Sequence, residues 1–196
     1  MTWEEAIKDY KIPREYHSVS LKQKTMLGDD IINLGVRWLK ASRKPSLYMH
    51  GNPGCGKTYF STALLRHLIE DGHRSIIFIK SDDLEKNLLD ASLGNLFNDQ
   101  GYKVYERELL EKYGEIPILF IDDLGTEKDT DRVRQQYGII IDRRVSEQLP
   151  TVYTSNLDLE QIGKTLGDRV AARLQISYQL RFKDQDLRKK VELFPI

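Results

Sequence analysis

Short apolar runs alternate with longer stretches of helical periodicity along most of the chain. The runs, rich in β-branched and aromatic residues, predict strands at Ser46–His50, Ser75–Lys80, Ile116–Asp122, Pro150–Ser155 and Ser177–Phe182. The stretches between them predict helices over 57–71, 82–112, 130–147 and 158–174. Such alternation is typical of an α/β fold in which helices flank a five-stranded parallel sheet.

Two further helical patterns precede the first predicted strand. Apolar residues recur at helical spacing over 27–41, and a shorter pattern covers Trp3–Tyr10. A chain of 196 residues is long enough for one well-buried core. We therefore predict an N-terminal arm over 1–25 and a single core domain over 26–196. Within that core the segment 91–113 is the least determined, because glycines interrupt its helical pattern.

A glycine-rich loop joins the first predicted strand to the helix that follows. It reads Gly51-Asn52-Pro53-Gly54-Cys55-Gly56-Lys57-Thr58 and fits the pattern G-x-x-x-x-G-K-[ST]. Glycines let successive backbone N–H groups converge on phosphate oxygens at the positive end of a helix. We predict that residues 51–59, Tyr59 included, bind ATP, that Lys57 reaches its β- and γ-phosphates, and that Thr58 is a ligand of Mg²⁺. A glycine-rich turn without a ligand is the alternative.

Two carboxylates end the third predicted strand. Asp122 and Asp123 follow the apolar run Ile116–Ile121, and the carboxyl ends of strands are where open α/β sheets bind ligands. We expect Asp122 to hold Mg²⁺ and Asp123 to polarise the water that attacks the γ-phosphate. Without the glycine-rich loop, the pair reads equally well as a solvated acidic turn.

Two later blocks carry further candidates. Asn156 follows the fourth predicted strand and reaches the γ-phosphate or the attacking water if that strand neighbours the loop-bearing one, although a helix cap is the commoner role for such an asparagine. Arg169 and Arg173 share one face of a predicted helix. Arginine suits a phosphate because its planar fork stays charged, but a salt-bridged surface helix explains the pair equally well.

The composition indicates the cellular compartment of the protein but does not indicate its binding partner. Thirty basic residues balance thirty acidic ones, so any attraction to nucleic acid has to come from local patches. The single cysteine, Cys55, cannot form an internal disulfide, and it reads as a small filler of the loop. The N-terminus lacks a signal-peptide pattern, and no long apolar run predicts a membrane span. We expect a cytoplasmic protein without a membrane partner.

Taken together, the order and spacing of these blocks resemble the AAA+ ATPases of the DnaC/DnaI helicase-loader group and the related IstB-type transposition helpers. The resemblance covers about Tyr10 to Lys190. It implies a P-loop AAA+ core. Larger relatives carry a helical lid, but the chain has no room for one after Arg188, so we expect no separate lid domain. The resemblance also implies that Asn156 is the sensor-1 residue, that Arg173 is an arginine finger reaching a neighbouring subunit with Arg169 as second candidate, and that Arg188 serves as sensor 2.

The resemblance also implies partners: a homo-oligomer, single-stranded DNA, and a replicative helicase, a transposase or another replication protein. In such proteins extra helices near the position of 83–100 contact DNA, but here that segment is acidic. Basic candidates for DNA contact lie elsewhere, at Arg132, Arg134, Arg143, Arg144, Lys164, Arg181, Lys183, Lys189 and Lys190.

The sequence thus predicts an ATP-hydrolysing AAA+ protein that remodels a replication or transposition complex. Two alternatives stay open. One is an adaptor that binds ATP to hold an assembly with little turnover, and the other is a P-loop kinase acting on a small molecule.

Overall fold

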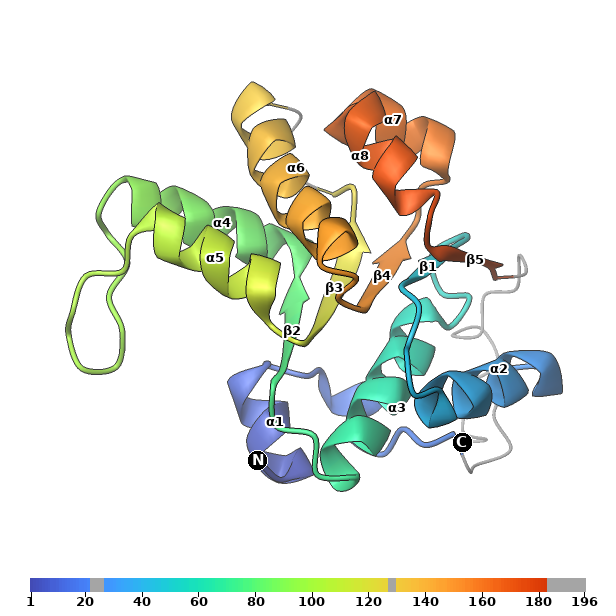
Figure 1. The fold of residues 1–196 in the computed structure, drawn as a ribbon. Helices are drawn as coiled ribbons and strands as arrows, with labels where there is room; N and C mark the ends of the chain where they lie inside the picture. Colours follow the sequence, from blue (N-terminus) through green and yellow to red (C-terminus); the bar gives the residue numbers. More distant parts are fainter. Residues whose placement is uncertain (22–26, 127–129, 183–196) are drawn as a thin grey trace, which may run out of the picture.

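A parallel sheet forms the centre of the molecule, which we describe from a computed structural model covering residues 1–21, 27–126 and 130–182 (Figure 1). Its strands are β1 (Leu47–His50), β2 (Ile76–Lys80), β3 (Ile118–Leu124), β4 (Thr151–Ser155) and β5 (Tyr178–Arg181). They lie in the order β2-β3-β4-β1-β5, and every neighbouring pair is parallel. The predicted five-stranded parallel α/β fold is confirmed.

Helices cover both faces of this sheet. The described helices are α1 (Trp3–Asp9), the short 3-10 helix η1 (Arg14–Tyr16), α2 (Asp29–Lys40), α3 (Lys57–Glu70), α4 (Ser81–Ser92), α5 (Glu106–Glu115), α6 (Asp131–Ser146), α7 (Leu159–Leu166) and α8 (Asp168–Leu174). Because strand side chains alternate, Leu47 and Met49 pack with α1 to α3, whereas Tyr48 between them packs with α4 to α8. Figure 1 shows these two groups of helices below and above the sheet.

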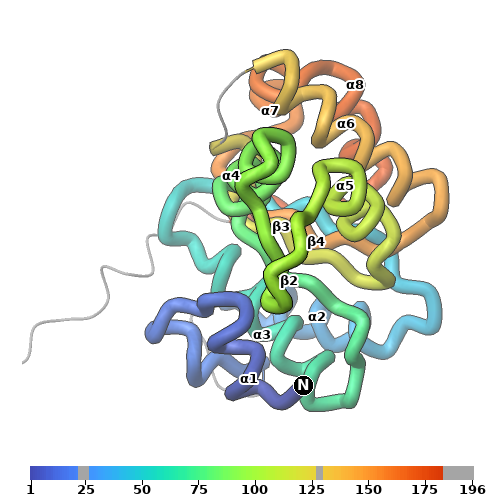
Figure 2. Tube along the Cα trace, turned by 90° about the vertical axis from the view of Figure 1, so that its left-hand side faces the viewer, coloured from blue at the N-terminus to red at the C-terminus, as the bar shows by residue number. Residues whose placement is uncertain are grey.

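Two predicted helices are each split in the structure. The prediction over 82–112 becomes α4 and α5, separated by a projecting loop in which Phe97 and Lys103 form an antiparallel bridge (Figures 1 and 2). Gly94 and Gly101, at φ +73° and +81°, turn the chain there. The prediction over 158–174 becomes α7 and α8, because Gly167 at φ +95° leaves the helical region.

The N-terminal residues pack on the core. Ala6 and Ile12 are buried in the cluster beneath the sheet, beside α3. The Trp3 indole donates to the carbonyl of His17 (2.8 Å), and the Tyr10 hydroxyl donates to the carbonyl of Ile76 at the start of β2 (2.7 Å). The apolar stripe of α1 is thus directed at the protein's own core.

Arg144 of α6 is the largest fully buried side chain. Its guanidinium donates to the Thr151 hydroxyl and to the carbonyls of Tyr113, Ile116 and Pro150 at 2.6–2.9 Å. Burial lowers the pKa of Arg144 to about 10. The prediction that Arg144 contacts DNA is wrong, because this side chain instead ties α6 to the chain entering β3 and β4.

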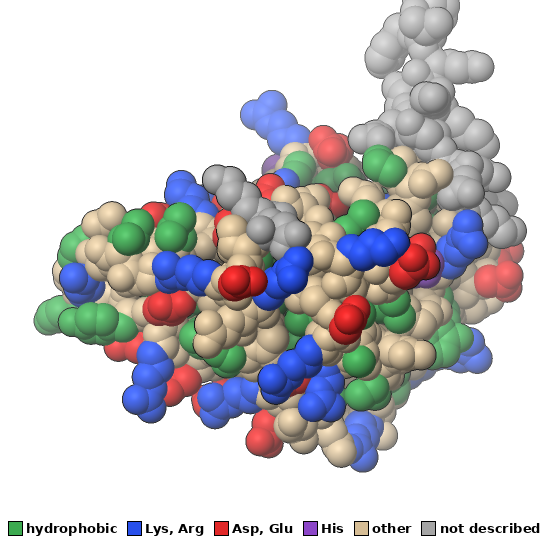
Figure 3. All heavy atoms as spheres, turned by 90° about the horizontal axis from the view of Figure 1, so that it is seen from above, with side chains coloured by type: hydrophobic (Ala, Val, Ile, Leu, Met, Phe, Trp, Pro, Cys, Tyr) green, Lys and Arg blue, Asp and Glu red, His purple; other side chains and the backbone are tan. Residues whose placement is uncertain are grey.

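The other described basic candidates for DNA contact are mostly engaged within the molecule. Arg132, Arg143 and Lys164 form ion pairs with glutamates, and Arg134 donates to backbone carbonyls of α7. Lys183, Lys189 and Lys190 lie outside the described residues. In Figure 3 basic and acidic side chains intermingle on the face above the sheet. Within the described ranges, no helix has the length and apolarity that a membrane span requires.

Candidate nucleotide-binding site

The glycine-rich loop leaves β1 and turns directly into α3. Gly51 has φ +148°, and a Cβ at this position would lie 2.8 Å from the carbonyl oxygen of Phe182. Gly56 precedes the first helical residue in the left-handed region, at φ +98°. No side chain caps α3, so its first N–H groups are available to an anion, which a helix N-terminus favours.

The Lys57 ammonium is buried beneath this loop, with the side chain only 4% exposed. It donates to the carbonyls of Gly51 (2.7 Å) and Asn52 (3.0 Å) and to Oδ1 of Asn156 (2.9 Å). No carboxylate of the described residues forms an ion pair with it. A buried cation surrounded by neutral acceptors favours the arrival of an anion.

The Asp122 carboxylate lies at the carboxyl end of β3 and is 1% exposed. Its Oδ1 accepts from the hydroxyls of Thr154 (2.6 Å) and Thr58 (3.1 Å), whereas its buried Oδ2 has no hydrogen-bond partner among the described residues. Burial, with the charge of Asp123 as a second cause, raises the pKa of Asp122 to about 6. When Asp122 is ionised, the described residues therefore leave part of its buried negative charge without a hydrogen-bond donor or a cation.

Asp123 occupies an irregular position in the sheet. Its φ is +59°, and the register between β3 and β4 shifts between Ile121 and Leu124. Its N–H donates to the Thr154 hydroxyl (2.8 Å). Asp123 is half-buried, and this irregularity interrupts the alternation of side chains between the two faces of the sheet at its position.

Asn156 follows β4, which pairs with β1 as the proposed role of this residue requires. The structure thereby brings Asn156 against Lys57, and Thr58 against Asp122, at one edge of the sheet.

The two candidate arginines lie in a separate cluster on α8. Arg173 donates from Nε to Oδ1 of Asp142 on α6 (2.8 Å), and Arg169 donates from a terminal nitrogen to Oδ2 of the same carboxylate. Among the described residues, both arginines bond to Asp142 and neither bonds to the loop of its own chain. Arg188 falls outside the described residues, so its predicted role stays a prediction.

These groups fit a nucleotide with its magnesium ion. The loop offers N–H donors and a buried ammonium, which suit phosphates, and the binding set from Gly51 to Tyr59 stays a prediction. Thr58 and Asp122 offer a hydroxyl and a carboxylate side by side, and the unpartnered Oδ2 of Asp122 is an acceptor that a hard cation would satisfy.

Comparison with known proteins assigns the family. The model of the IstB-like ATP binding proteins matches residues 20–177. The chain belongs to this family. It is 30% identical over 148 residues to the replicative helicase loader DnaC of Buchnera aphidicola subsp. Baizongia pistaciae, a match covering 74% of this chain and 57% of the relative.

Two further comparisons agree on the fold and the family. The replicative helicase loader DnaI of Bacillus subtilis is 31% identical over 117 residues, covering 59% of this chain and 34% of the relative. A crystal structure of DnaI superposes with a TM-score of 0.72 at 25% identity, covering 89% of this chain and 96% of that one. The IstB-like chain therefore has the AAA+ core of the DnaC/DnaI group, and it spans about half the length of the DnaC relatives and about a third of the DnaI relative.

Sequence reasoning missed two residues of this IstB-like protein. Thr154 donates to the Asp122 carboxylate and accepts from the backbone N–H of Asp123, so one hydroxyl holds the first carboxylate and the backbone of the second. The sequence does show that Thr154 belongs to a run of polar residues at the end of a strand. Its partners, however, can be identified only from the register between β3 and β4. Asp142, which holds both arginines, had no signal beyond being an acid on a helix.

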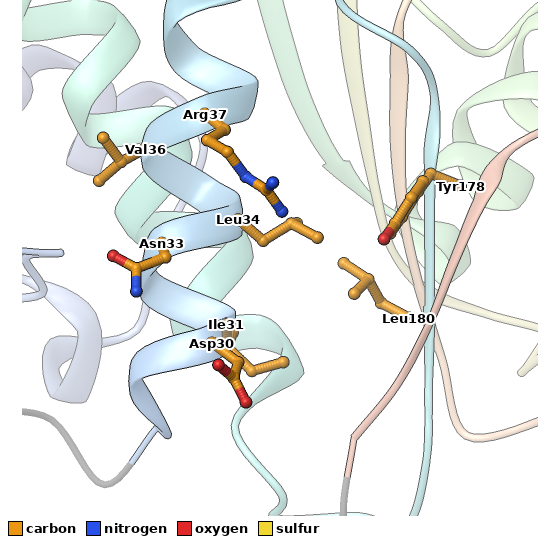
Figure 4. A pocket seen from close by; sticks show the side chains of 8 residues that line it. All are labelled: Asp30, Ile31, Asn33, Leu34, Val36, Arg37, Tyr178 and Leu180. Carbon is orange, nitrogen blue, oxygen red and sulfur yellow. The ribbon is translucent and has the colours of Figure 1, made fainter.

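The IstB-like core also has a groove of about 690 Å³ between α2 and β5. Figure 4 shows Leu34, Tyr178 and Leu180 facing one another across it. None of its lining residues belongs to the predicted nucleotide site. This groove is therefore distinct from the loop and from the sheet edge that carries the acidic pair.

Proposed function

We propose that this IstB-like protein binds and hydrolyses ATP in a Mg²⁺-dependent manner as a helicase-loader-type AAA+ switch. The observation that carries the proposal is the pairing of two uncompensated buried groups at one sheet edge. Among the described residues, the Lys57 ammonium contacts only neutral acceptors and Oδ2 of Asp122 has no hydrogen-bond partner. A phosphate chain with its cation supplies what each lacks.

Each side chain then has a defined task. Lys57 binds the β- and γ-phosphates in place of its present acceptors, and Thr58 and Asp122 hold the magnesium ion. A magnesium ion held by these two residues would supply positive charge to the phosphate oxygens. Asp123 orients a water molecule whose oxygen bonds to the γ-phosphorus as the bond to the β-phosphate oxygen breaks, giving ADP and inorganic phosphate. Asn156, released from Lys57, contacts the γ-phosphate.

The site is completed by a second copy of the chain. Arg173 lies on α8 and, among the described residues, bonds to Asp142 and not to the loop of its own chain, so we assign it to the nucleotide of a neighbouring subunit. ATP bound between subunits favours a ring, spiral or filament, and hydrolysis releases it.

The partners follow from the relatives. Because the curated relatives are described as replicative helicase loaders, we propose a replicative helicase as protein partner, together with single-stranded DNA. A transposase is the alternative partner. Capturing each candidate with the hydrolysis-slowed Asp123→Asn protein in ATP distinguishes the two, and retention of neither would contradict both.

Nucleotide binding is tested at Lys57. Lys57→Ala removes the only described buried ammonium beneath the loop, so we expect ATP affinity measured by calorimetry to fall at least about 100-fold. Lys40→Ala, an exposed lysine at the end of α2, is the matched control and should bind as the wild type does. Unchanged ATP binding by Lys57→Ala would refute the assignment of this loop.

Turnover separates the proposed ATPase from the other two functions. Phosphate release from ATP should be measurable, and should be compared with and without single-stranded DNA. Binding without release in either condition would indicate an assembly adaptor. Phosphate transfer to a small acceptor instead of to water would indicate a kinase.

A further inference from the structure

The carboxylate of Asp142 is largely buried, and both candidate arginines bind it. Its side chain is 18% exposed on α6, whereas those of Arg173 and Arg169 on α8 are 42% and 77% exposed. Figures 1 and 2 both show α6 beside α8. Each carboxylate oxygen accepts from a different arginine.

The two arginines are held by different atoms. Arg173 uses Nε, the inner nitrogen of its guanidinium, and among the described residues its terminal nitrogens make no hydrogen bond. Arg169 instead uses a terminal nitrogen, so the tip of its side chain is directed at its own subunit. A guanidinium is a rigid planar fork, so anchoring its inner edge orients the outer donors.

We propose that Asp142 is a positioning residue that orients Arg173 for the nucleotide of the neighbouring subunit, while Arg169 acts only through Asp142. This inference rests on the proposed function, since it assumes that Arg173 is donated in trans. Arg173 presents two free terminal nitrogens to a phosphate, and Arg169 balances the remaining charge on Asp142. The geometry thus selects Arg173 over Arg169 as the finger.

The direct test is the turnover of Asp142→Asn. Loss of the charge and of one acceptor oxygen leaves Arg173 with a weaker, neutral anchor that Arg169 competes for, so we expect ATP turnover to fall roughly 10- to 100-fold, the effect of misplacing a catalytic group by about 1 Å. ATP affinity should stay at the wild-type value. Asp142→Glu keeps a carboxylate and should retain more activity than Asp142→Asn. Glu147→Gln removes an exposed charge from the end of the same helix and is the matched control.

Mixed subunits separate positioning from a structural role. Asp142→Asn has an intact nucleotide site and a misdirected finger, whereas Asp123→Asn has a defective site and an intact finger. Mixing the two should restore turnover, because the Asp123→Asn subunits supply oriented arginines to the competent sites. A defect that stays within the Asp142→Asn subunit would not be rescued, and that result would overturn the inference.

The remaining outcomes distinguish this inference from the function on which it rests. If Arg173→Ala abolishes turnover but both Asp142 variants hydrolyse ATP normally, Asp142 does not position the finger and the proposed function stands. A larger loss in Arg169→Ala than in Arg173→Ala would reverse the assignment of the arginines and overturn the inference. Normal turnover by Arg173→Ala would refute the intersubunit site itself.

Discussion

At the scale of single residues, Lys57 and Asp122 define the site by what they lack. Each is a charged side chain at most 4% exposed, and neither is paired with an opposite charge among the described residues. Isolated buried charges destabilise a fold, so their retention at one sheet edge indicates a function that uses them. The local sequence motif predicted both residues, but their incomplete pairing became visible only in the structure.

The raised pKa of Asp122 has a measurable effect on stability. A folded-state pKa near 6, against about 4 in the unfolded chain, means that the ionised carboxylate destabilises the fold above pH 6 by ~3 kcal/mol, and that this effect fades as the pH falls toward 4. We therefore expect Asp122→Asn to raise the melting temperature of the nucleotide-free protein at pH 7.5, and this gain to disappear near pH 4.

Thermal denaturation across this pH range, with a chelator present, measures the effect. The exposed Asp99→Asn is the control and should shift the melting temperature little at any pH. A gain in stability for Asp122→Asn that is independent of pH would contradict the raised pKa.

At the scale of elements, the strands were the most predictable part of the chain. Their apolar runs matched β1 to β5 to within one or two residues. In β1, β3 and β4 burial on both faces of the sheet leaves a strong local signal, whereas β5 is largely exposed. The break at Gly167 was missed because the residues on both sides keep helical spacing, and periodicity does not register the positive φ of this glycine. The break between α4 and α5 falls where glycines interrupt the predicted helical pattern, but that pattern did not give the bounds of the two helices.

The site residues divide in the same way. Residues 51–58 form one continuous motif, and Asp122 and Asp123 are adjacent in the sequence. Each of these two segments could therefore be recognised from its local sequence and its place after a predicted strand. Thr154 and Asp142 make their contacts across about 30 residues of chain, and those contacts depend on strand register and on the packing of α6 against α8. A single sequence does not specify such packing.

Gly125 lies in the turn that follows Asp122 and Asp123, and a substitution there tests how closely the backbone of this turn is constrained. Gly125 has φ +96°, and a Cβ there would lie 2.7 Å from Cδ1 of Leu157. We expect Gly125→Ala to destabilise the protein by about 1–3 kcal/mol through backbone strain and this overlap. Gly138→Ala is the matched control, because that helical glycine has open space around it and should gain up to about 1 kcal/mol.

Chemical denaturation of both variants gives the two free energies of unfolding. Equal values for Gly125→Ala and Gly138→Ala would show that the turn tolerates a side chain. In that case the geometry of the acidic pair would not depend on this glycine.

At the scale of the whole molecule, the proposed site is shared between copies, so nucleotide should control assembly. With a non-hydrolysable ATP analogue we expect species larger than the monomer in mass photometry, and the monomer to prevail in ADP. Arg173→Ala should weaken this association about tenfold or more, because it removes a charge-assisted contact across the interface. Glu147→Gln should assemble as the wild type does. A monomer in every nucleotide state would contradict the intersubunit site.

The order of the strands also bears on how the protein is made. β1, which carries the nucleotide loop, lies between β4 and β5, so Leu47 pairs with Val152 on one side and with Tyr178 on the other. Both neighbours are synthesised more than a hundred residues after β1, and pairing over such separations is slow. During synthesis on the ribosome, β1 has both neighbouring strands only after β5 has been made. We therefore expect ATP binding to the loop to stabilise only the last stage of folding. A nascent chain stalled before β5 should expose an unpaired β1 edge to chaperones.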